Sequence, residues 1–306
     1  MKLALRVFSF SAILLLCLAN FAWTQEASPI LVEQDVVYGN AGDVKLYLDI
    51  AYPTRSEGPY PALVYIYCAW GWYTGFDRQF YSDTIRKAAQ KGYVAVTIDF
   101  RRLDVMQDGR SRYPFPAQVE DAKAAVRWLR ANSARYNIDP NRIGALGWSG
   151  GGHMALMLGL TDPTDGLEGS NGNEGYSSKV QAVVSAAGIV DMAMYYEQSL
   201  QTYRSYIPMI ENMMQGTPDE RPKEYEAASP ITYLCADSPP VLTLHGDKDR
   251  NVWLEQAEDL DIKMKEVGAY HKLVVDPGAT HLDFLLFRSH EQTIFDFLDS
   301  NLKTTE

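Results

Sequence analysis

Apolar and polar positions alternate over residues 31–52, which is the pattern of strands that bury one face and expose the other. Val36 and Tyr38 lie before a turn-forming stretch at residues 39–42, and Leu46 continues the alternation after it. Two alternating segments joined by a short glycine-containing turn predict an antiparallel hairpin near the beginning of the chain.

After the hairpin the pattern changes to continuous apolar runs, which are typical of strands buried on both faces. These runs occupy residues 62–67, 93–98, 143–148, 180–187, 241–244 and 273–275. Helical segments are predicted between and after them at residues 83–91, 117–134, 254–267 and 284–302, with a further helix directly after Ser149. Strands that alternate with helices predict an α/β fold, in which a mostly parallel, twisted sheet has helices on both faces.

Two segments interrupt this alternation. Residues 161–178 are polar and rich in glycine, which indicates a surface loop. Residues 192–228 are rich in tyrosine and methionine and lie between two predicted strands. An insertion in that position can cover a site at the edge of the sheet. We therefore interpret residues 192–228 as a cap within a single domain that spans residues 25–306.

The first 24 residues have the organisation of a secretory signal peptide. Lys2 and Arg6 precede an apolar run over residues 7–19, and Ala22 and Thr24 offer small residues before a cleavage point. The apolar run is shorter than the roughly 20 residues of a membrane-spanning helix, so a membrane anchor is the weaker interpretation. We expect cleavage after Thr24 and a periplasmic or secreted protein.

The chain is acidic. Its formal net charge is −11, and removal of the signal peptide changes this to −13 because two cations and no acid are lost. Binding to nucleic acid depends on Lys and Arg at the phosphates, so this charge argues against a nucleic-acid partner. Of the cysteines, Cys68 and Cys235 remain after cleavage. They are predicted near opposite edges of the sheet, and we expect two buried free thiols.

Gly147, Ser149 and Gly151 form a G-x-S-x-G pattern where a predicted strand meets a predicted helix. This spacing is that of a nucleophile elbow, in which a serine is held on a sharp turn at the end of a strand. Small residues suit the turn because its backbone angles are strained and the helix packs close to the strand. The positive end of that helix favours negative charge beside the serine. The alternative is a glycine-rich turn with a bystander serine.

A serine hydroxyl is a weak nucleophile and needs a base at the same edge of the sheet, which is the edge where the strands end. His281 follows the last predicted strand by a short loop, so it is the predicted base. The other histidines fit less well. His153 points away from the turn, His245 precedes two of the acid candidates, His271 lies at the opposite edge, and His290 is expected to be solvated on the last helix.

An acid must orient His281 and stabilise its charged form. Asp191, Asp247 and Asp249 all follow strands at the correct edge and lie between the serine and the histidine in the chain. The order serine, acid, histidine is the one that accompanies the hydrolase elbow. The residues alone favour Asp249 only slightly over the other two.

Ester chemistry also needs hydrogen-bond donors where a negative oxygen forms. The backbone N–H of Gly150 is one expected donor, and others are expected from the loop at residues 68–75. Trp70, Trp72 and Trp148 lie near these donors and are candidates for lining a substrate pocket, with core packing as the alternative. No His, Cys or Asp cluster has the spacing of metal ligands, so we expect neither a metal nor an organic cofactor.

From about residue 34 to residue 300 the chain resembles α/β-hydrolases, and among them the BD-FAE-like carboxylesterases of the acetyl-xylan or feruloyl esterase type. The segments behind the resemblance include G-W-S-G-G-G-H at residues 147–153, H-G-D-K-D-R-N-V at residues 245–252 and G-A-T-H at residues 278–281. The resemblance implies the α/β-hydrolase fold and a triad of Ser149, His281 and Asp249. It also implies hydrolysis of carboxylic esters, including acetyl or feruloyl esters of plant polysaccharide.

The chain departs from the family in one loop. The family has His-Gly-Gly-Gly-Trp where this chain has Cys-Ala-Trp-Gly-Trp at residues 68–72. The donors that the resemblance implies are backbone amides, which Ala69 and Trp70 can supply, although positive φ at either residue adds strain of about 1–3 kcal/mol. The predicted function is an exported serine esterase. The alternatives are an exported peptidase or amidase with the same triad, and an inactive hydrolase scaffold that only binds.

Overall fold

The structure is a computed structural model that describes residues 29–54, 57–68, 77–104, 106, 110–284 and 287–303. The expected signal peptide and the candidate residues Ala69, Trp70 and Trp72 lie outside these ranges. Within the described ranges, no helix has both the length and the apolar character needed to cross a bilayer.

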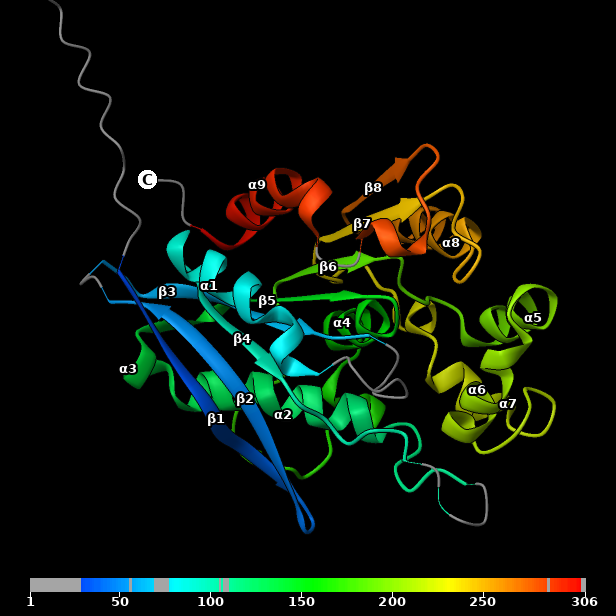
Figure 1. Cartoon of the computed structure of the whole chain (residues 1–306), viewed down its shortest axis with the longest axis horizontal. Coiled ribbons are helices and arrows are strands. Elements are labelled where there is room, and N and C mark those ends of the chain that lie inside the picture. The colour runs from blue at the N-terminus through cyan, green and yellow to red at the C-terminus, as the bar shows by residue number, and fades with distance from the viewer. Residues whose placement is uncertain are drawn as a thin grey trace, which may run out of the picture.

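The described residues form an eight-stranded sheet in the order β1-β2-β4-β3-β5-β6-β7-β8 (Figure 1). β1 pairs with β2, and β2 with β4, in antiparallel fashion, whereas the pairs from β4 to β8 are parallel. The predicted mostly parallel sheet with an antiparallel N-terminal hairpin is confirmed. The strands are β1 (Ile30–Ala41), β2 (Val44–Pro53), β3 (Tyr60–Ile66), β4 (Val94–Ile98), β5 (Ile138–Trp148), β6 (Ala182–Ala186), β7 (Val241–Gly246) and β8 (His271–Asp276).

The hairpin turn is shorter than the prediction. Ala41 still pairs with Val44, so the turn consists of Gly42 and Asp43 instead of residues 39–42. Gly42 has φ = +60°, a conformation that glycine adopts without a steric penalty. A two-residue turn matches the twist of the paired strands and lets the ladder continue to its end.

Helices cover both faces of the sheet (Figure 1). α1 and α9 lie together on one face, where Lys87 of α1 and Glu291 of α9 form an ion pair of 3.3 Å. α2 and α4 pack together on the other face, and α8 packs against β7 and β8. These helices are α1 (Ser82–Gln90), α2 (Ala117–Ala131), α4 (Gly150–Leu160), α8 (Leu254–Glu266) and α9 (Glu291–Leu302), and a short α3 (Ser133–Tyr136) follows α2.

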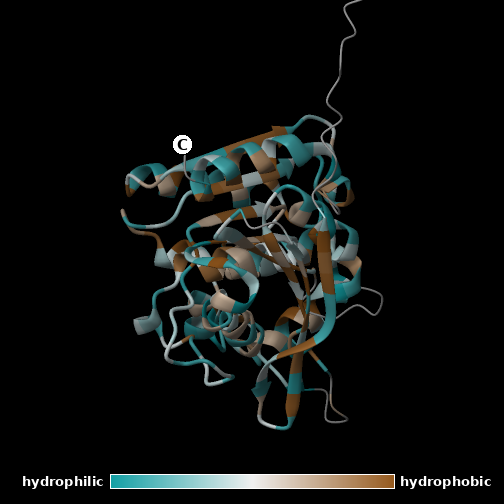
Figure 2. Cartoon of the chain, turned by 90° about the vertical axis from the view of Figure 1, so that its left-hand side faces the viewer, coloured by the Kyte–Doolittle hydropathy of each residue, from teal (hydrophilic) through white to brown (hydrophobic). Residues whose placement is uncertain are grey.

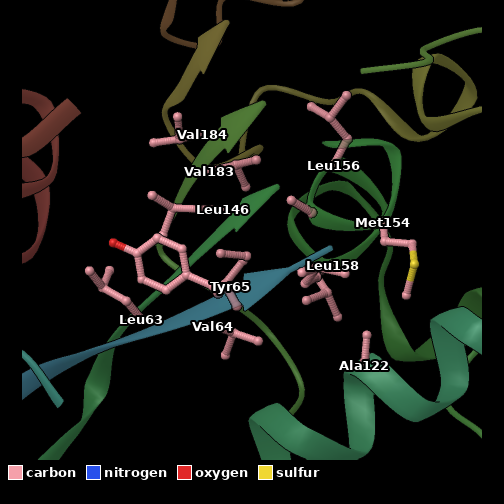
Figure 3. Close-up of a cluster of buried hydrophobic side chains, with 14 of the residues drawn as sticks. Leu63, Val64, Tyr65, Ala122, Leu146, Met154, Leu156, Leu158, Val183 and Val184 are labelled. Carbon is pink, nitrogen blue, oxygen red and sulfur yellow. The ribbon is translucent and has the colours of Figure 1, made fainter. Parts of the chain in front are cut away.

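The core lies on both sides of the central strands. Every residue of β3 is buried. Figure 3 shows Leu63 and Tyr65 on one side of β3 and Val64 on the other, toward Ala122 of α2. Figure 2 shows much of the hydrophobic colour in the strands, whereas the helices mix hydrophilic and hydrophobic positions. Burial on both faces explains why the central strands have continuous apolar runs instead of alternating ones.

The last helix is shorter than predicted. α9 begins at Glu291 instead of residue 284, and two short 3-10 helices, His281–Phe284 and Arg288–His290, precede it. Phe287 lies between them with φ = 56°, which is outside the conformations of a right-handed helix. A continuous helix is therefore interrupted at this point, although its apolar spacing extends further back along the chain.

The predicted cap segment forms helices at the carboxyl end of the sheet, and Figure 1 shows them grouped beyond the tips of the β5 and β6 arrows. Asn251 Nδ2 donates to the Tyr206 hydroxyl (2.8 Å), and Trp253 Nε1 donates to Thr202 Oγ1 (3.3 Å). These contacts join the segment to the loop after β7. Its role as a cap stays a prediction. Its helices are α5 (Met192–Thr202), α6 (Ile207–Met214) and α7 (Pro222–Ala227).

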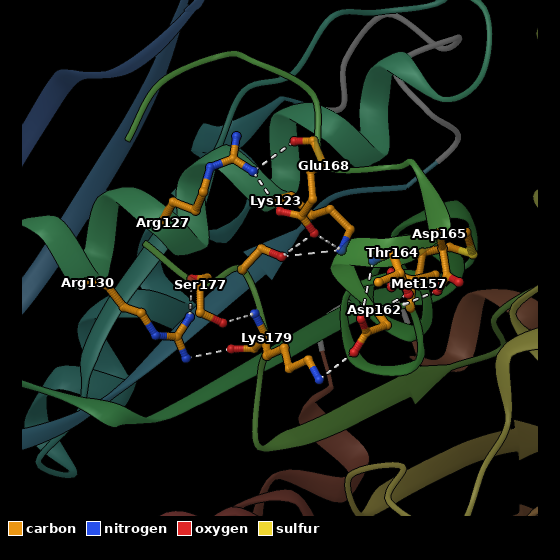
Figure 4. A network of polar contacts seen from close by, with 12 residues as sticks. Lys123, Arg127, Arg130, Met157, Asp162, Thr164, Asp165, Glu168, Ser177 and Lys179 are labelled. Carbon is orange, nitrogen blue, oxygen red and sulfur yellow. Dashed lines mark hydrogen bonds and ion pairs between the residues drawn. The ribbon is translucent and has the colours of Figure 1, made fainter. Parts of the chain in front are cut away.

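The segment at residues 161–178 is held by buried cations of α2, so a plain surface loop is an incomplete description (Figure 4). Lys123 Nζ lies 2.7 Å from Glu168 Oε1, and Arg127 Nη1 lies 3.0 Å from Glu168 Oε2. Burial by itself raises the pKa of Glu168, but hydrogen bonds from Lys123 and Ser178 more than offset this and lower it. The ionised carboxylate thus balances two buried cations.

Both cysteines in the described part of the chain are free, as predicted, but only one is buried. Cys68 follows β3, and burial raises the pKa of its thiol to about 12. Cys235 is exposed, so the prediction that it is buried is wrong. It lies in a turn before β7, where its backbone N–H donates to Ser238 Oγ (3.0 Å).

Candidate active site

Ser149 lies at the sharp turn between β5 and α4, with φ = 58° and ψ = −123°. A non-glycine residue in such a region stores on the order of 1–3 kcal/mol of strain. A Cβ atom on Gly147 would lie 2.0 Å from Gly151 O, and one on Gly151 would lie 2.2 Å from Ile66 O. Glycine is required at both positions because α4 begins in direct contact with β5 and β3.

Backbone hydrogen bonds hold the turn in place. The Ser149 N–H donates to Ala186 O of β6 (2.8 Å), and Ser149 O accepts from the His153 N–H (3.0 Å). Gly150, the predicted oxyanion donor, is the first residue of α4, so its N–H has no partner within the helix. The positive end of α4 therefore adjoins Ser149, where it favours a developing negative charge.

His281 lies immediately after the loop that follows β8, and its Nε2 is 2.9 Å from Ser149 Oγ. β8 is separated from β5 by β6 and β7, so the loop must bring the imidazole back across the edge of the sheet. Gly246 makes room for this loop, because a Cβ atom there would lie 2.2 Å from Ala279 O. The Lys248 N–H donates to the same carbonyl (2.9 Å) and joins the loops after β7 and β8.

Asp249 is buried and binds the other nitrogen of the imidazole. Its Oδ2 lies 2.6 Å from His281 Nδ1, and its Oδ1 accepts from the backbone N–H groups of Asn251 (2.8 Å) and Val252 (3.0 Å). A carboxylate only accepts hydrogen bonds, so Nδ1 carries the proton and Nε2 faces Ser149 as the acceptor. This is the tautomer that a base requires.

The other acid candidates have different partners. Asp191 accepts from the Met194 N–H (2.9 Å) and caps α5. Asp247 accepts from the Gly278 N–H (2.7 Å), so it adds a second link between the loops after β7 and β8. The tertiary contacts therefore distinguish Asp249, which the residues alone favoured only slightly.

Three other histidines have partners away from the serine. His153 Nε2–H donates to a backbone carbonyl (2.7 Å), and burial lowers the pKa of this imidazole to about 4. His271 contacts Thr243 Oγ1 (2.9 Å). His290 Nε2 lies 3.1 Å from Asp276 Oδ1, and its side chain is 11% exposed. The prediction of a solvated His290 is wrong because the residue precedes α9 and packs toward the end of β8.

His245, which the sequence analysis set aside as the base, is a neighbour of the acid. It is fully buried, and its Nε2 lies 2.9 Å from Val252 O and 3.6 Å from Asp249 Oδ2. Burial lowers the pKa of His245, although the charge of Asp249 opposes this. A neutral imidazole therefore packs behind the acid and holds its loop. The sequence placed both residues after the same predicted strand, but it did not indicate that they are in contact.

Trp148 lies against His281. The indole Nε1–H donates to the backbone oxygen of His281 (2.9 Å), and the two ring centroids are 4.9 Å apart at 41°. Only 3% of Trp148 is exposed. So little accessible surface does not support the interpretation of Trp148 as a residue that lines a substrate pocket.

Serine, imidazole and carboxylate thus form one hydrogen-bonded chain at the carboxyl edge of the sheet. Such a chain can move a proton from the Ser149 hydroxyl to His281 while Asp249 stabilises the resulting imidazolium. Of the predicted oxyanion donors, only Gly150 belongs to the described residues. In the part of the chain that the structure describes, no cluster of three or more His, Cys, Asp or Glu side chains is arranged to hold a metal ion.

Sequence comparison relates the chain to esterases. The sequence model of the BD-FAE family matches residues 48–264. Esterase LipC from Mycobacterium tuberculosis is 30% identical over 252 residues, which cover 80% of this chain and 58% of LipC. The chain therefore spans less than two thirds of the length of this curated relative.

Solved structures of esterases have a similar fold. A truncated form of a carbohydrate esterase from gut microbiota matches with a TM-score of 0.76 and 27% identity, over 92% of this chain and 99% of that chain. Esterase 2 of Thermogutta terrifontis, phosphorylated by paraoxon, matches with a TM-score of 0.69 and 25% identity, over 92% of this chain and 98% of that chain.

Proposed function

The chain belongs to the BD-FAE family and has the α/β-hydrolase fold, and we propose that it is a serine carboxylesterase. The observation behind the proposal is the contact of His281 with Ser149 Oγ at 2.9 Å and with Asp249 Oδ2 at 2.6 Å. The names of similar proteins, esterase LipC and the carbohydrate esterase, support esters as the class of substrate.

In the proposed reaction, Ser149 Oγ attacks the ester carbonyl carbon while its proton passes to His281 Nε2. The C–O bond to the alcohol then breaks, and His281 returns the proton to the leaving alkoxide. Water attacks the acyl-serine in the same way, with His281 again as the base, and releases the carboxylic acid. Asp249 remains ionised and stabilises the imidazolium in both halves of the reaction.

The negative oxygen of each tetrahedral intermediate needs donors that are already in position. Gly150 supports this role because its N–H begins α4 and has no helical partner. We propose Ala69 and Trp70 as the other donors, and Trp72 as a substrate-binding residue, on the family resemblance. Because backbone amides donate, the substitution of the family's glycines need not remove the function.

We further propose that the substrates are acetyl or feruloyl esters, either small or linked to plant polysaccharide. The family match and the similar carbohydrate esterase support this class. Release of acetate from acetylated xylan and of ferulate from methyl ferulate can be compared with hydrolysis of p-nitrophenyl esters of graded chain length. Activity on the p-nitrophenyl esters alone would contradict a polysaccharide substrate.

We propose that the protein is exported, because Lys2 and Arg6 precede a short apolar run at residues 7–19. The mature protein recovered from the periplasm or the medium should begin at Gln25. Recovery of the chain with its first 24 residues intact would exclude this cleavage.

The direct test of the proposed esterase activity is the removal of the nucleophile Ser149. Ser149→Ala should reduce the hydrolysis of p-nitrophenyl acetate by about 10⁴-fold or more, because the acyl intermediate cannot form. Ser177→Ala, at an exposed serine, is the matched control and should keep the wild-type rate. A fluorophosphonate probe should label the wild type and not Ser149→Ala. Equal rates, or a wild type that the probe does not label, would refute the mechanism.

A further inference from the structure

We propose that Trp148 is a positioning residue for the base: it fixes His281 relative to Ser149 and stabilises the imidazolium. The inference rests on the esterase function proposed above. Trp148 directly precedes Ser149, and its indole N–H donates to the His281 backbone oxygen at 2.9 Å. This bond joins the strand of the nucleophile to the loop of the base without passing through the triad side chains.

His281 needs such a restraint because it lies on a loop and not within a long element. The links from Asp247 to Gly278 and from Lys248 to Ala279 hold the beginning of that loop. The bond from Trp148 acts at His281 itself, three residues after Gly278. A displacement of about 1 Å at a reacting group can reduce the rate on the order of 10²-fold, so this restraint bears directly on catalysis.

The indole also lies next to the group whose charge changes. Its ring centroid lies 4.9 Å from that of His281, within the roughly 6 Å over which an aromatic face attracts a cation. During the proposed reaction, His281 becomes positively charged when it takes the Ser149 proton. The attraction is therefore stronger in the transition state than in the ground state, and such an interaction raises kcat without a matching change in KM.

The kinetic test uses Trp148→Phe, which keeps an aromatic ring and removes the N–H donor. Trp128→Phe is the matched control, because Trp128 is buried at 6% exposure on α2 and packs on Tyr136. Trp148→Phe should lower kcat on p-nitrophenyl acetate about 10-fold, the upper range for one net hydrogen bond, with KM within about twofold of wild type. Trp128→Phe should change neither constant.

Two kinetic outcomes would overturn the inference. The first is a Trp148→Phe variant with the kcat of Trp128→Phe. The second is a KM that rises about tenfold at unchanged kcat, which is the signature of a residue that only binds substrate. Thermal unfolding of both variants shows whether a lowered rate reflects a smaller folded fraction.

A second measurement needs no substrate. A charged imidazolium quenches the emission of an adjacent indole. Wild-type tryptophan fluorescence should therefore fall when the pH is lowered and His281 is protonated. Asp249 and His245 also face His281, and both are kept in every variant. This pH-dependent fall in fluorescence, the fluorescence transition, should be absent from His281→Gln and Trp148→Phe and present in Trp128→Phe. A transition that persists in His281→Gln would show that the signal does not come from this contact and would overturn it.

The two measurements separate the inference from the function it rests on, because fluorescence requires no substrate. If the wild type were inactive but kept the fluorescence transition, the proposed esterase function would be overturned, and with it the catalytic role of Trp148. An active wild type whose kcat is unaffected by Trp148→Phe would overturn the role of Trp148 alone.

Discussion

At the scale of single residues, the site depends on the orientation of one imidazole. His281 Nε2 contacts Ser149, its Nδ1 contacts Asp249, and its backbone oxygen accepts from Trp148. Asp249 is in turn held by the backbone N–H groups of Asn251 and Val252. Together these contacts restrict the rotation of the imidazole and keep its proton on Nδ1, so that Nε2 can accept from the hydroxyl.

Asparagine at position 249 should preserve the shape of the site and disable it. An amide can present its NH₂ group to His281 and so favour the tautomer with the proton on Nε2, which cannot accept from Ser149. We expect Asp249→Asn to lower kcat by roughly 10³–10⁴-fold, as for the buried acid of other serine hydrolases. The measurement is steady-state hydrolysis of p-nitrophenyl acetate at saturating substrate.

Asp247→Asn is the control for this prediction. Asp247 lies two residues away and accepts a backbone hydrogen bond from Gly278, which the carbonyl oxygen of asparagine can also accept. The kcat of Asp247→Asn should stay within about threefold of the wild type, because a hydrogen bond to a charged acceptor is replaced by one to a neutral acceptor. If Asp247→Asn were the inactive variant and Asp249→Asn the active one, the acid would be misassigned.

At the scale of elements, the site forms where strands and loops approach more closely than side chains would allow. α4 begins against β3, and the loop after β8 passes over Gly246 at the end of β7. These approaches bring the ends of β5, β7 and β8 to one site, although β6 separates β5 from β7 and β8 in the sheet. The glycines at these points are therefore requirements of packing and not only of local turn geometry.

Gly151→Ala tests the approach of α4 to β3. Alanine is the better helix former by about 1 kcal/mol. Its Cβ atom would, however, lie 2.2 Å from Ile66 O and 2.8 Å from Tyr67 O, both of which are backbone atoms. The clash should outweigh the helix preference, and we expect a loss of about 2–3 kcal/mol in the free energy of unfolding, measured by chemical denaturation.

Gly175→Ala is the corresponding control, because no atom lies within 4 Å of a Cβ atom built there. This substitution should change the free energy of unfolding by less than about 0.5 kcal/mol, like other surface changes. A Gly151→Ala variant as stable and as active as Gly175→Ala would mean that α4 does not press against β3 in solution.

At the scale of the whole molecule, buried neutral histidines couple stability to pH. Burial lowers the pKa of His153 to about 4, and it also lowers the pKa values of His245 and His271. In the unfolded chain these groups titrate near 6.5. Unfolding therefore takes up protons below pH 6.5, so the stability that these residues provide above pH 6.5 is lost as the pH falls, and for His153 this loss extends down to about pH 4.

His153→Gln isolates one part of this effect. Glutamine can still donate to the carbonyl that His153 contacts, but it does not titrate. In the wild type, His153 should account for about 2 kcal/mol of the stability lost between pH 7.5 and pH 5, given a folded pKa of about 4. The loss should be smaller by that amount in His153→Gln when denaturation is measured at both pH values. A loss of the same size in His153→Gln would indicate that His153 is already charged in the folded protein.

The sequence by itself determined the elements and the candidates for the site. Continuous apolar runs predicted the central strands, because burial on both faces leaves no polar side to alternate. The G-x-S-x-G spacing predicted a turn at Ser149, because only small residues let a helix start so close to a strand. His281 could be selected because a loop after a parallel strand must emerge at the carboxyl edge.

Only the tertiary structure decided which groups meet there. Position in the chain favours Asp249 only slightly over Asp191 and Asp247, and the resemblance only implied it, whereas their hydrogen bonds in the structure distinguish them. The contact of Trp148 with His281 spans 133 positions and leaves no trace in local periodicity. The physical reason is that the apolar pattern reports only local burial. Which side chains come into contact depends on the conformations of the loops, and these are set by the packing of strands that are distant in the sequence.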